Sequence, residues 1–347
     1  MKAAVVEQLK KPLVVRDFPN PEMGPNDALI RLEACGVCRS DWHIWQGDLS
    51  WVGLNLPLPA VLGHEQAGVV EEVGSGVRLV QPGMRVLTPF HNGCGACRYC
   101  VAGASNLCDA PGRRTGGFAQ YAVIGGADFN AIPLPDGVSF EAGAAMGCRF
   151  MTSYHGVADR GQVKGGDWVV VNGCGGIGLS AVQIAAALGA QVIAVDLDET
   201  KLTRARAEGA VETIDARDGD VGQRVKEITR GGADVSIDAL GIKATMLNSI
   251  RSLRKGGIHV QIGITSSEES GEVALPIDMI TMSEIEFRGS LGNPNHHYRP
   301  MLNMVASGKL HPQSIVGERI SLADVPRVME SMGSFGTVGF TTITDFR

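Results

Sequence analysis

The segment between Trp168 and Asp196 constrains the fold most, because it orders a strand, a glycine cluster, a helix and a second strand. Trp168–Asn172 is a β-branched run, Leu179–Leu188 has an Ala-rich helical pattern, and Val192–Asp196 is a second apolar run. Between the first strand and the helix lies a G-x-G-x-x-G pattern made of Gly173, Cys174, Gly175, Gly176, Ile177 and Gly178. In such a loop the first glycine permits a tight turn, the second lets a pyrophosphate approach the backbone, and the third allows close helix–strand packing. We therefore expect a parallel sheet that binds a dinucleotide at the helix N-terminus, where free N–H groups favour anions. The alternative is a glycine-rich turn of any α/β protein.

The choice of dinucleotide depends on Asp196, which ends the second strand close to the spacing of about 20 residues at which an acid binds the ribose. Its carboxylate can accept both ribose hydroxyls of NAD and would repel the additional phosphate of NADP. Neither Arg nor Lys stands at positions 197–199. The sequence therefore favours NAD.

The rest of the chain divides by its pattern. The first ~150 residues predict short strands such as Ala3–Val6, Ala28–Leu32, Gln66–Val73 and Arg85–Thr88, separated by Pro and Gly turns. From about residue 165 to 290, strands and helices alternate, as they do in a doubly wound parallel sheet. Within this part the pattern predicts, among others, a helix at Val221–Thr229 and a strand at His259–Gly263. At 347 residues, two domains are expected. We expect the last ~55 residues to return and pack on the first domain.

Charge and hydropathy exclude several kinds of partner. The chain has 31 Lys and Arg against 37 Asp and Glu, a net charge of −6. This balance argues against nucleic acid or an anionic membrane, which both reward basic residues. No apolar run reaches the ~20 residues of a membrane span, and the N-terminus does not resemble a signal peptide. We expect a cytoplasmic protein, in which the eight cysteines serve metal sites or core packing.

One group of cysteines lies in a single short loop. Cys94, Cys97, Cys100 and Cys108 form C-x2-C-x2-C-x7-C. Four thiolates at this spacing suit one tetrahedral zinc with no open position, which would stabilise the loop and do no chemistry. An iron–sulfur cluster is the rival, but its bacterial spacing closes with three residues and Pro.

A second set of possible metal ligands, Cys38, His64 and Cys148, is dispersed along the chain. Two thiolates and one imidazole leave a fourth zinc position for water or substrate, as in catalytic zinc sites. Sequence spacing does not show that they meet, and each taken singly also suits a place in the core.

At these residues the chain resembles the zinc-dependent medium-chain alcohol dehydrogenases. The segments GVCRSDWH, GHE, GCGACRYC, GCRFMTSYHG and NGCGGIGLSAVQIA appear in the family's order over nearly the whole length. The resemblance implies a GroES-like catalytic domain from residues 1–152 and 292–347, with a Rossmann domain, residues 153–291, inserted between. It also implies a homo-oligomer, commonly a tetramer, that acts on a small alcohol, aldehyde or ketone.

The resemblance assigns roles by motif. Cys38, His64 and Cys148 would hold a catalytic zinc, with Glu65 behind the metal and Asp41 on the other ring nitrogen of His64. Ser40 would bind the substrate oxygen and pass its proton towards His43 and solvent. The expected cofactor contacts are Arg39 on the pyrophosphate, Lys201 near the adenosine ribose, and Thr152, Ile262–Ile264, Ser290 and Leu291 along the nicotinamide.

One departure concerns the C-terminal region, where relatives often place Arg or Lys after a glycine to bind the pyrophosphate. Here Phe340 follows Gly339, so cofactor binding would depend more on Arg39 and the helix dipole.

Trp42, Trp51 and Phe90, with Trp45 between them, could line an aromatic pocket for hydrophobic alcohols or ketones; the alternative is that they are core residues. Two other functions stay open: a zinc polyol dehydrogenase of the same superfamily, and a non-catalytic NAD-binding protein with structural zincs.

Overall fold

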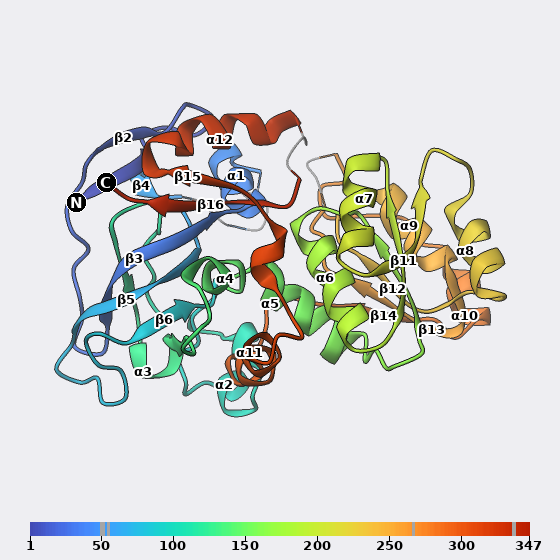
Figure 1. Cartoon of the computed structure of the whole chain (residues 1–347), viewed down its shortest axis with the longest axis horizontal. Helices are drawn as coiled ribbons and strands as arrows, with labels where there is room; N and C mark the ends of the chain where they lie inside the picture. The colour runs from blue at the N-terminus through green and yellow to red at the C-terminus, as the bar shows by residue number, and fades with distance from the viewer. Residues whose placement is uncertain (49–52, 54–55, 266–267, 335–337) are drawn as a thin grey trace. The chain divides into compact units, whose positions relative to one another are not determined.

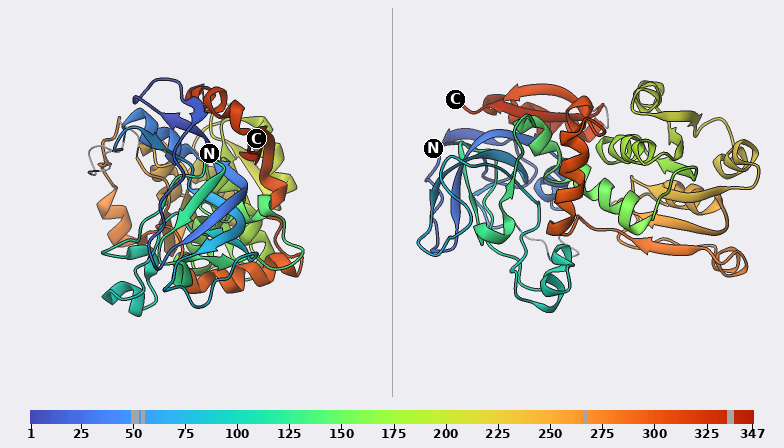
Figure 2. Two further views of the ribbon diagram at one scale, coloured as in Figure 1. Left: turned by 90° about the vertical axis from the view of Figure 1, so that its left-hand side faces the viewer. Right: turned by 60° about the horizontal axis from the view of Figure 1, so that its bottom comes forward.

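The computed structural model describes residues 1–48, 53, 56–265, 268–334 and 338–347. The chain divides into two compact units, one formed by Met1–Met151 with Gly292–Arg347 and the other by Thr152–Leu291 (Figure 1). Both ends of the chain belong to the first unit (Figure 2). No helix in the described ranges is both long and apolar enough to cross a membrane.

The first unit is built on two mainly antiparallel sheets. One has the strand order β2-β1-β4; the other has the order β15-β16-β3-β5-β6-β8, with β7 also paired to β3 and with β15 and β16 paired in parallel. Its strands are β1 (Lys2–Val6), β2 (Val14–Asp17), β3 (Ala28–Val37), β4 (Ala60–Val61), β5 (Glu65–Val73), β6 (Arg85–Thr88), β7 (Tyr121–Ile124), β8 (Ile132–Pro133), β15 (Val316–Ser321) and β16 (Phe340–Asp345). Its helices are α1 (Arg39–Gln46), α2 (Arg98–Val101), α3 (Ala127–Asn130), α4 (Phe140–Ala145), α11 (Tyr298–Ala306) and α12 (Val325–Ser331). β16 pairs antiparallel with β3, so the C-terminal segment packs on the N-terminal part of the first unit.

The core of this unit holds the apolar side chains of both chain segments. Ile30, Val37 and Phe118 pack in one buried cluster with Leu322 and Ile343 from the C-terminal part. The return of the chain therefore supplies core residues as well as strands.

The second unit is a parallel sheet with the strand order β11-β10-β9-β12-β13-β14. Its strands are β9 (Trp168–Asn172), β10 (Gln191–Asp196), β11 (Ala210–Asp215), β12 (Ala233–Asp238), β13 (Leu253–Gln261) and β14 (Glu286–Gly289). Its helices are α6 (Gly176–Ala187), α7 (Glu199–Ala207), α8 (Val221–Thr229), α9 (Lys243–Arg251) and α10 (Ile277–Met282); α5 (Arg149–Tyr154) enters the unit and continues as a π-helical turn, His155–Arg160. Helices cover the sheet faces (Figure 1), which explains why Val169, Val170 and Val171 are all fully buried.

The strand order places the first strand of this unit, β9, at the centre, with the chain leaving it in one direction to β10 and later in the other to β12. Such a reversal creates the crevice at the carboxyl ends of the strands where doubly wound sheets bind ligands. The predicted fold class, a β-rich domain joined to a doubly wound sheet, is confirmed.

Element boundaries differ from the predictions where glycines stand. The helix predicted from Leu179 begins at Gly176, because the last glycines of the loop already form its first turn. The strand predicted from His259 begins at Leu253, since Gly256 and Gly257 lie within β13 instead of forming a turn before it.

Candidate functional site

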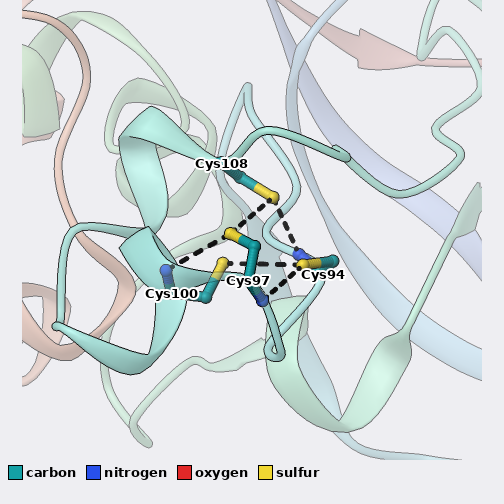
Figure 3. Close-up of side chains that lie close together, drawn as sticks. All are labelled: Cys94, Cys97, Cys100 and Cys108. Carbon is teal, nitrogen blue, oxygen red and sulfur yellow. Dashed lines mark hydrogen bonds between the residues drawn. The ribbon is translucent and has the colours of Figure 1, made fainter.

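The cysteine loop brings its four thiols together (Figure 3). The sulfur atoms all lie within 4.8 Å of one another, with Cys94 Sγ 4.0 Å from Cys100 Sγ and Cys97 Sγ 3.8 Å from Cys108 Sγ. Thiolates bound to one tetrahedral zinc at about 2.3 Å are separated by about 3.8 Å. The donor set and its spacing therefore fit one zinc ion with all four positions filled.

Backbone N–H groups turn towards these sulfurs. The N–H of Cys97 donates to Cys94 Sγ at 3.2 Å, and that of Cys94 donates to Cys108 Sγ at 3.2 Å. The backbone hydrogen bond from Cys100 is the largest cause that lowers the pKa of Cys97, to about 6. The loop thus favours the thiolate form at Cys97, which metal binding requires.

The dispersed ligands also converge. Cys38 precedes α1, His64 precedes β5, and Cys148 lies between α4 and α5. The candidate donor atoms of these residues and of Glu65 lie within 4.8 Å of one another, and all four side chains are buried. A pair of thiols and an imidazole with little exposure form a donor set that fits zinc.

Asp41 fixes the imidazole of His64. Its Oδ1 accepts hydrogen bonds from His64 Nδ1 at 2.8 Å and from the Gly63 N–H at 3.0 Å, while Oδ2 accepts from the Cys38 N–H at 3.2 Å. With Nδ1 engaged, Nε2 is the ring nitrogen left for a metal, and carboxylates commonly orient metal-binding histidines in this way. Burial lowers the pKa of His64, but Asp41 and Cys38 outweigh it and raise that pKa to about 10.

The thiols of Cys38 and Cys148 share a hydrogen bond. This bond is the largest cause that lowers the pKa of Cys38, and it is also the largest cause that raises the pKa of Cys148. Of the two thiols, Cys38 is therefore the one that gives up its proton more readily.

Glu65 lies in the same cluster, but Arg149 engages its carboxylate. Arg149 Nε lies 2.8 Å from Oε1 and 3.2 Å from Oε2, Nη2 also contacts Oε2, and the Arg149 N–H donates to Oε1 at 3.2 Å. Arg149 Nη2 also donates to the Val37 carbonyl at 2.9 Å, and the guanidinium lies 4.5 Å from the centre of the Phe340 ring. The Phe340 ring thus packs against the arginine that directly follows Cys148.

Ser40 and His43 lie three residues apart on α1, so their side chains lie on neighbouring positions of one helix face. His43 Nδ1 lies 2.9 Å from Asp48 Oδ2, a partner that the sequence analysis did not identify. Arg39, on the same helix, donates to the Met332 carbonyl and stacks over Trp42 at 4.1 Å from the ring centre.

The aromatic residues that were considered for a substrate pocket lie in different surroundings. The Phe90 ring lies 6.0 Å from that of His64 in an edge-on arrangement, and Trp42 is half-buried at the edge of the core. The suggestion that Trp45 could join a pocket is wrong, because its indole is buried in the core and its N–H donates to the Lys11 carbonyl at 2.7 Å. Trp51 lies outside the described residues.

The glycine loop follows β9 as predicted by its motif. Gly173 has φ +90°, and a Cβ on Gly178 would lie 1.7 Å from the Gly173 carbonyl oxygen, so both positions require glycine. A Cβ on Gly175 would meet nothing within 4 Å, which leaves the open space that a pyrophosphate needs. Asp196 accepts the Cys174 N–H at 2.7 Å and the Leu197 N–H at 2.8 Å, so its anion is held at the end of β10.

Residues expected along the nicotinamide lie in the second unit. The backbone of Gly156 approaches Ile262 and Ser290 so closely that an added Cβ would lie 2.5 Å and 3.6 Å from their side chains. Among the described residues, the buried hydroxyls of Thr152 and Ser290 have no hydrogen-bond partner, as expected where a polar ligand belongs. Lys201 lies in the first turn of α7. The side chains of Ile264 and Leu291 are exposed.

Comparison with known proteins agrees with these arrangements. Residues 24–136 match the alcohol dehydrogenase GroES-like domain, and residues 176–307 match the zinc-binding dehydrogenase domain. An alcohol dehydrogenase of Geobacillus stearothermophilus is 36% identical over 315 residues, which cover 89% of this chain and 90% of the relative. The chain belongs to the zinc-dependent medium-chain alcohol dehydrogenase family. It is an oxidoreductase acting on alcohols.

Other relatives extend the comparison to both ends of the chain. An NAD-dependent alcohol dehydrogenase of Sulfurisphaera tokodaii is 31% identical, with 98% of each chain covered. The structure of an alcohol dehydrogenase from Thermus sp. ATN1 superposes with a TM-score of 0.90 at 31% identity, over 99% of this chain and 100% of that one. The prediction of the family and of its two-part fold is confirmed.

Proposed function

We propose that the enzyme transfers hydride reversibly between a hydrophobic primary or secondary alcohol and NAD, at a zinc held by Cys38, His64 and Cys148. The convergence of these three buried donors supports the proposal most directly. Both oxygens of Glu65 face Arg149, which keeps that carboxylate engaged and leaves a fourth position for an oxygen ligand.

Zinc bound there would act as a Lewis acid that makes a substrate hydroxyl more acidic. The chain's own residues hold and move the proton. Asp41 orients His64 so that its Nε2 serves the metal, Ser40 accepts the proton from the substrate oxygen, and His43 carries it towards solvent. The hydroxyls of Thr152 and Ser290 would form hydrogen bonds with the amide group of the cofactor.

The fixed anion of Asp196 supports NAD over NADP, since it would repel a phosphate on the ribose. Phe90 beside His64 supports a substrate with an apolar body, because a polyol would leave hydroxyls without partners there. Activity on a sorbitol-like substrate in preference to a simple alcohol would favour the polyol alternative.

The second zinc, at Cys94, Cys97, Cys100 and Cys108, would be structural. The four thiolates would occupy all four coordination positions of a tetrahedral zinc, so no position remains for a substrate. We therefore propose two zincs per chain.

We also propose a homo-oligomer, with a tetramer as the expected state. β14 is an edge strand of the parallel sheet, and apolar side chains are exposed beside it, with Met282 at 76%, Ile277 at 60% and Phe287 at 42%. Light scattering on a sizing column tests the state, and a monomer would refute it. None of the eight cysteines, all of which lie in the described residues, forms a disulfide, which suits a reducing compartment, so we place the enzyme in the cytoplasm.

The direct test compares Cys38→Ala with Cys35→Ala. Both cysteines are buried near the same end of β3, but only Cys38 lies in the ligand cluster. We expect Cys38→Ala to lose one zinc per chain and alcohol-dependent NAD reduction, while NADH still binds by fluorescence titration. Cys35→Ala should keep both. Normal turnover by Cys38→Ala would refute the proposed mechanism.

A further inference from the structure

The C-terminal end of α1 folds the chain back onto the helix. Gly47 has φ +72°, its N–H donates to the Ile44 carbonyl at 3.0 Å, and the next N–H, from Asp48, donates to the His43 carbonyl at 3.0 Å. These two bonds form a Schellman motif, in which the residue after the glycine lies over the helix residue five positions earlier. The turn therefore places the Asp48 side chain next to that of His43 by backbone geometry alone.

In such motifs an apolar contact often joins these two positions. Here a polar contact replaces it, with His43 Nδ1 2.9 Å from Asp48 Oδ2 and about a quarter of each side chain exposed. The Trp42 ring meets the His43 ring edge-on, with the ring centres 5.1 Å apart. The imidazole is thus held by a carboxylate and an aromatic ring.

We propose that Asp48 is a positioning residue that fixes the tautomer of His43 for proton transfer. This inference rests on the proposed function, since it assigns His43 to the proton path. A carboxylate accepts hydrogen bonds only, so it holds the proton on Nδ1 and leaves the lone pair of Nε2 free to accept another. When Nε2 accepts a proton, the ring becomes positive next to the Asp48 anion, which stabilises that charge.

Asp41, the acidic residue within α1, holds His64 in the same way that Asp48 holds His43. Asp41 accepts a hydrogen bond from Nδ1 of His64 and leaves its Nε2 for the metal that Cys38 and Cys148 would share. Asp48 accepts from Nδ1 of His43. One short helix and its closing turn therefore provide one carboxylate for a metal ligand and another for a proton carrier.

Asp48→Asn tests the inference in the zinc-loaded enzyme, with Asp17→Asn as a control that removes a charge from an exposed side chain of the same unit. An Asn amide keeps the shape, loses the charge and can donate to Nδ1, which favours the wrong tautomer. We expect kcat for alcohol oxidation to fall about tenfold or more, with KM for NAD and alcohol changed less than about twofold. The solvent isotope effect should grow as proton transfer limits the rate. A kcat of Asp48→Asn within twofold of the wild type would overturn the inference.

A double-mutant cycle separates positioning from a general structural effect. If Asp48 acts through His43, Asp48→Asn causes no further loss in a His43→Ala background. An equal fold-loss in both backgrounds would mean that Asp48 only supports the fold around it, and would refute the assignment.

Nitrogen NMR of ¹⁵N-histidine-labelled enzyme tests the contact without turnover. We expect His43 to carry its proton on Nδ1 in the wild type and to change this pattern in Asp48→Asn. Protonation on Nε2 in the wild type would overturn the inference whatever the kinetics. If the wild type shows the Nδ1 proton but oxidises no alcohol, the proposed function fails and the tautomer assignment stands.

Discussion

Removing Arg149 should destabilise the first unit strongly. Glu65 has no solvent exposure, and Arg149 is 7% exposed. Arg149→Met keeps an apolar stem against Phe340 but removes the guanidinium, whose Nε lies 2.8 Å and 3.2 Å from the two carboxylate oxygens. Among the hydrogen bonds of the described residues, that of the backbone N–H of residue 149, at 3.2 Å, would then be the one left to the buried Glu65 carboxylate.

Breaking a buried ion pair by removing one partner costs about 3–5 kcal/mol, because it leaves an uncompensated charge in a low dielectric. For a domain of this size, 1 kcal/mol shifts the melting temperature by about 2–4 °C. We therefore expect Arg149→Met to melt about 6–20 °C below the wild type, measured by scanning calorimetry with zinc saturating.

Two variants make this prediction specific. Arg319→Met breaks the pair with Glu141, whose Nε–Oε1 distance of 2.7 Å is similar but whose arginine is 57% exposed, and it should cost less than about 1 kcal/mol. Adding Glu65→Gln to Arg149→Met replaces the orphaned anion with a neutral amide. The loss of unfolding free energy in the double variant should be about 1–3 kcal/mol smaller than the sum of the losses in the two single variants. An Arg149→Met transition within about 2 °C of the wild type, or strictly additive losses, would refute the reasoning.

Three further predictions concern the other sites. Cys97→Ala should remove one zinc per chain and lower the melting temperature, by metal analysis and calorimetry; an unchanged metal content would contradict the four-thiolate site. Asp196→Asn should raise the ratio of kcat/KM for NADP to that for NAD about tenfold, because the repelling charge is gone, and an unchanged ratio would refute the role of Asp196. Burial lowers the pKa of His259 to about 4, so the unfolded chain takes up a proton that the folded chain resists. Stability should therefore fall as the pH drops from about 6.5 to 4, by up to about 3 kcal/mol, and urea titrations of His259→Gln should lack this part of the slope.

Features that depend on neighbouring residues in the chain could be predicted from the sequence. Buried β-branched runs such as Trp168–Asn172 and the glycine loop after it identified the parallel sheet, because a strand covered on both faces is apolar throughout. The spacing of the four cysteines was enough to predict that their thiols meet, since all four lie in one short loop. The helix Val221–Thr229 was predicted with the bounds it has.

Contacts between distant residues could not be read in this way. Arg149 and Glu65 lie 84 residues apart, and nothing in either segment names the other as its partner. A signal did exist, since an arginine directly after a buried ligand such as Cys148 needs an acid nearby. Asp48 carried a local signal as well, because a glycine that ends a helix folds the next residue back over it.

Anomalous scattering from crystals, measured on both sides of the zinc absorption edge, tests the central claim most directly. We predict two zinc peaks per chain, one within the Cys94 loop and one about 2.0–2.3 Å from Cys38 Sγ, His64 Nε2 and Cys148 Sγ, with a non-protein ligand in its fourth position. A single peak in the cysteine loop, or a second ion whose fourth ligand is Glu65, would contradict the account.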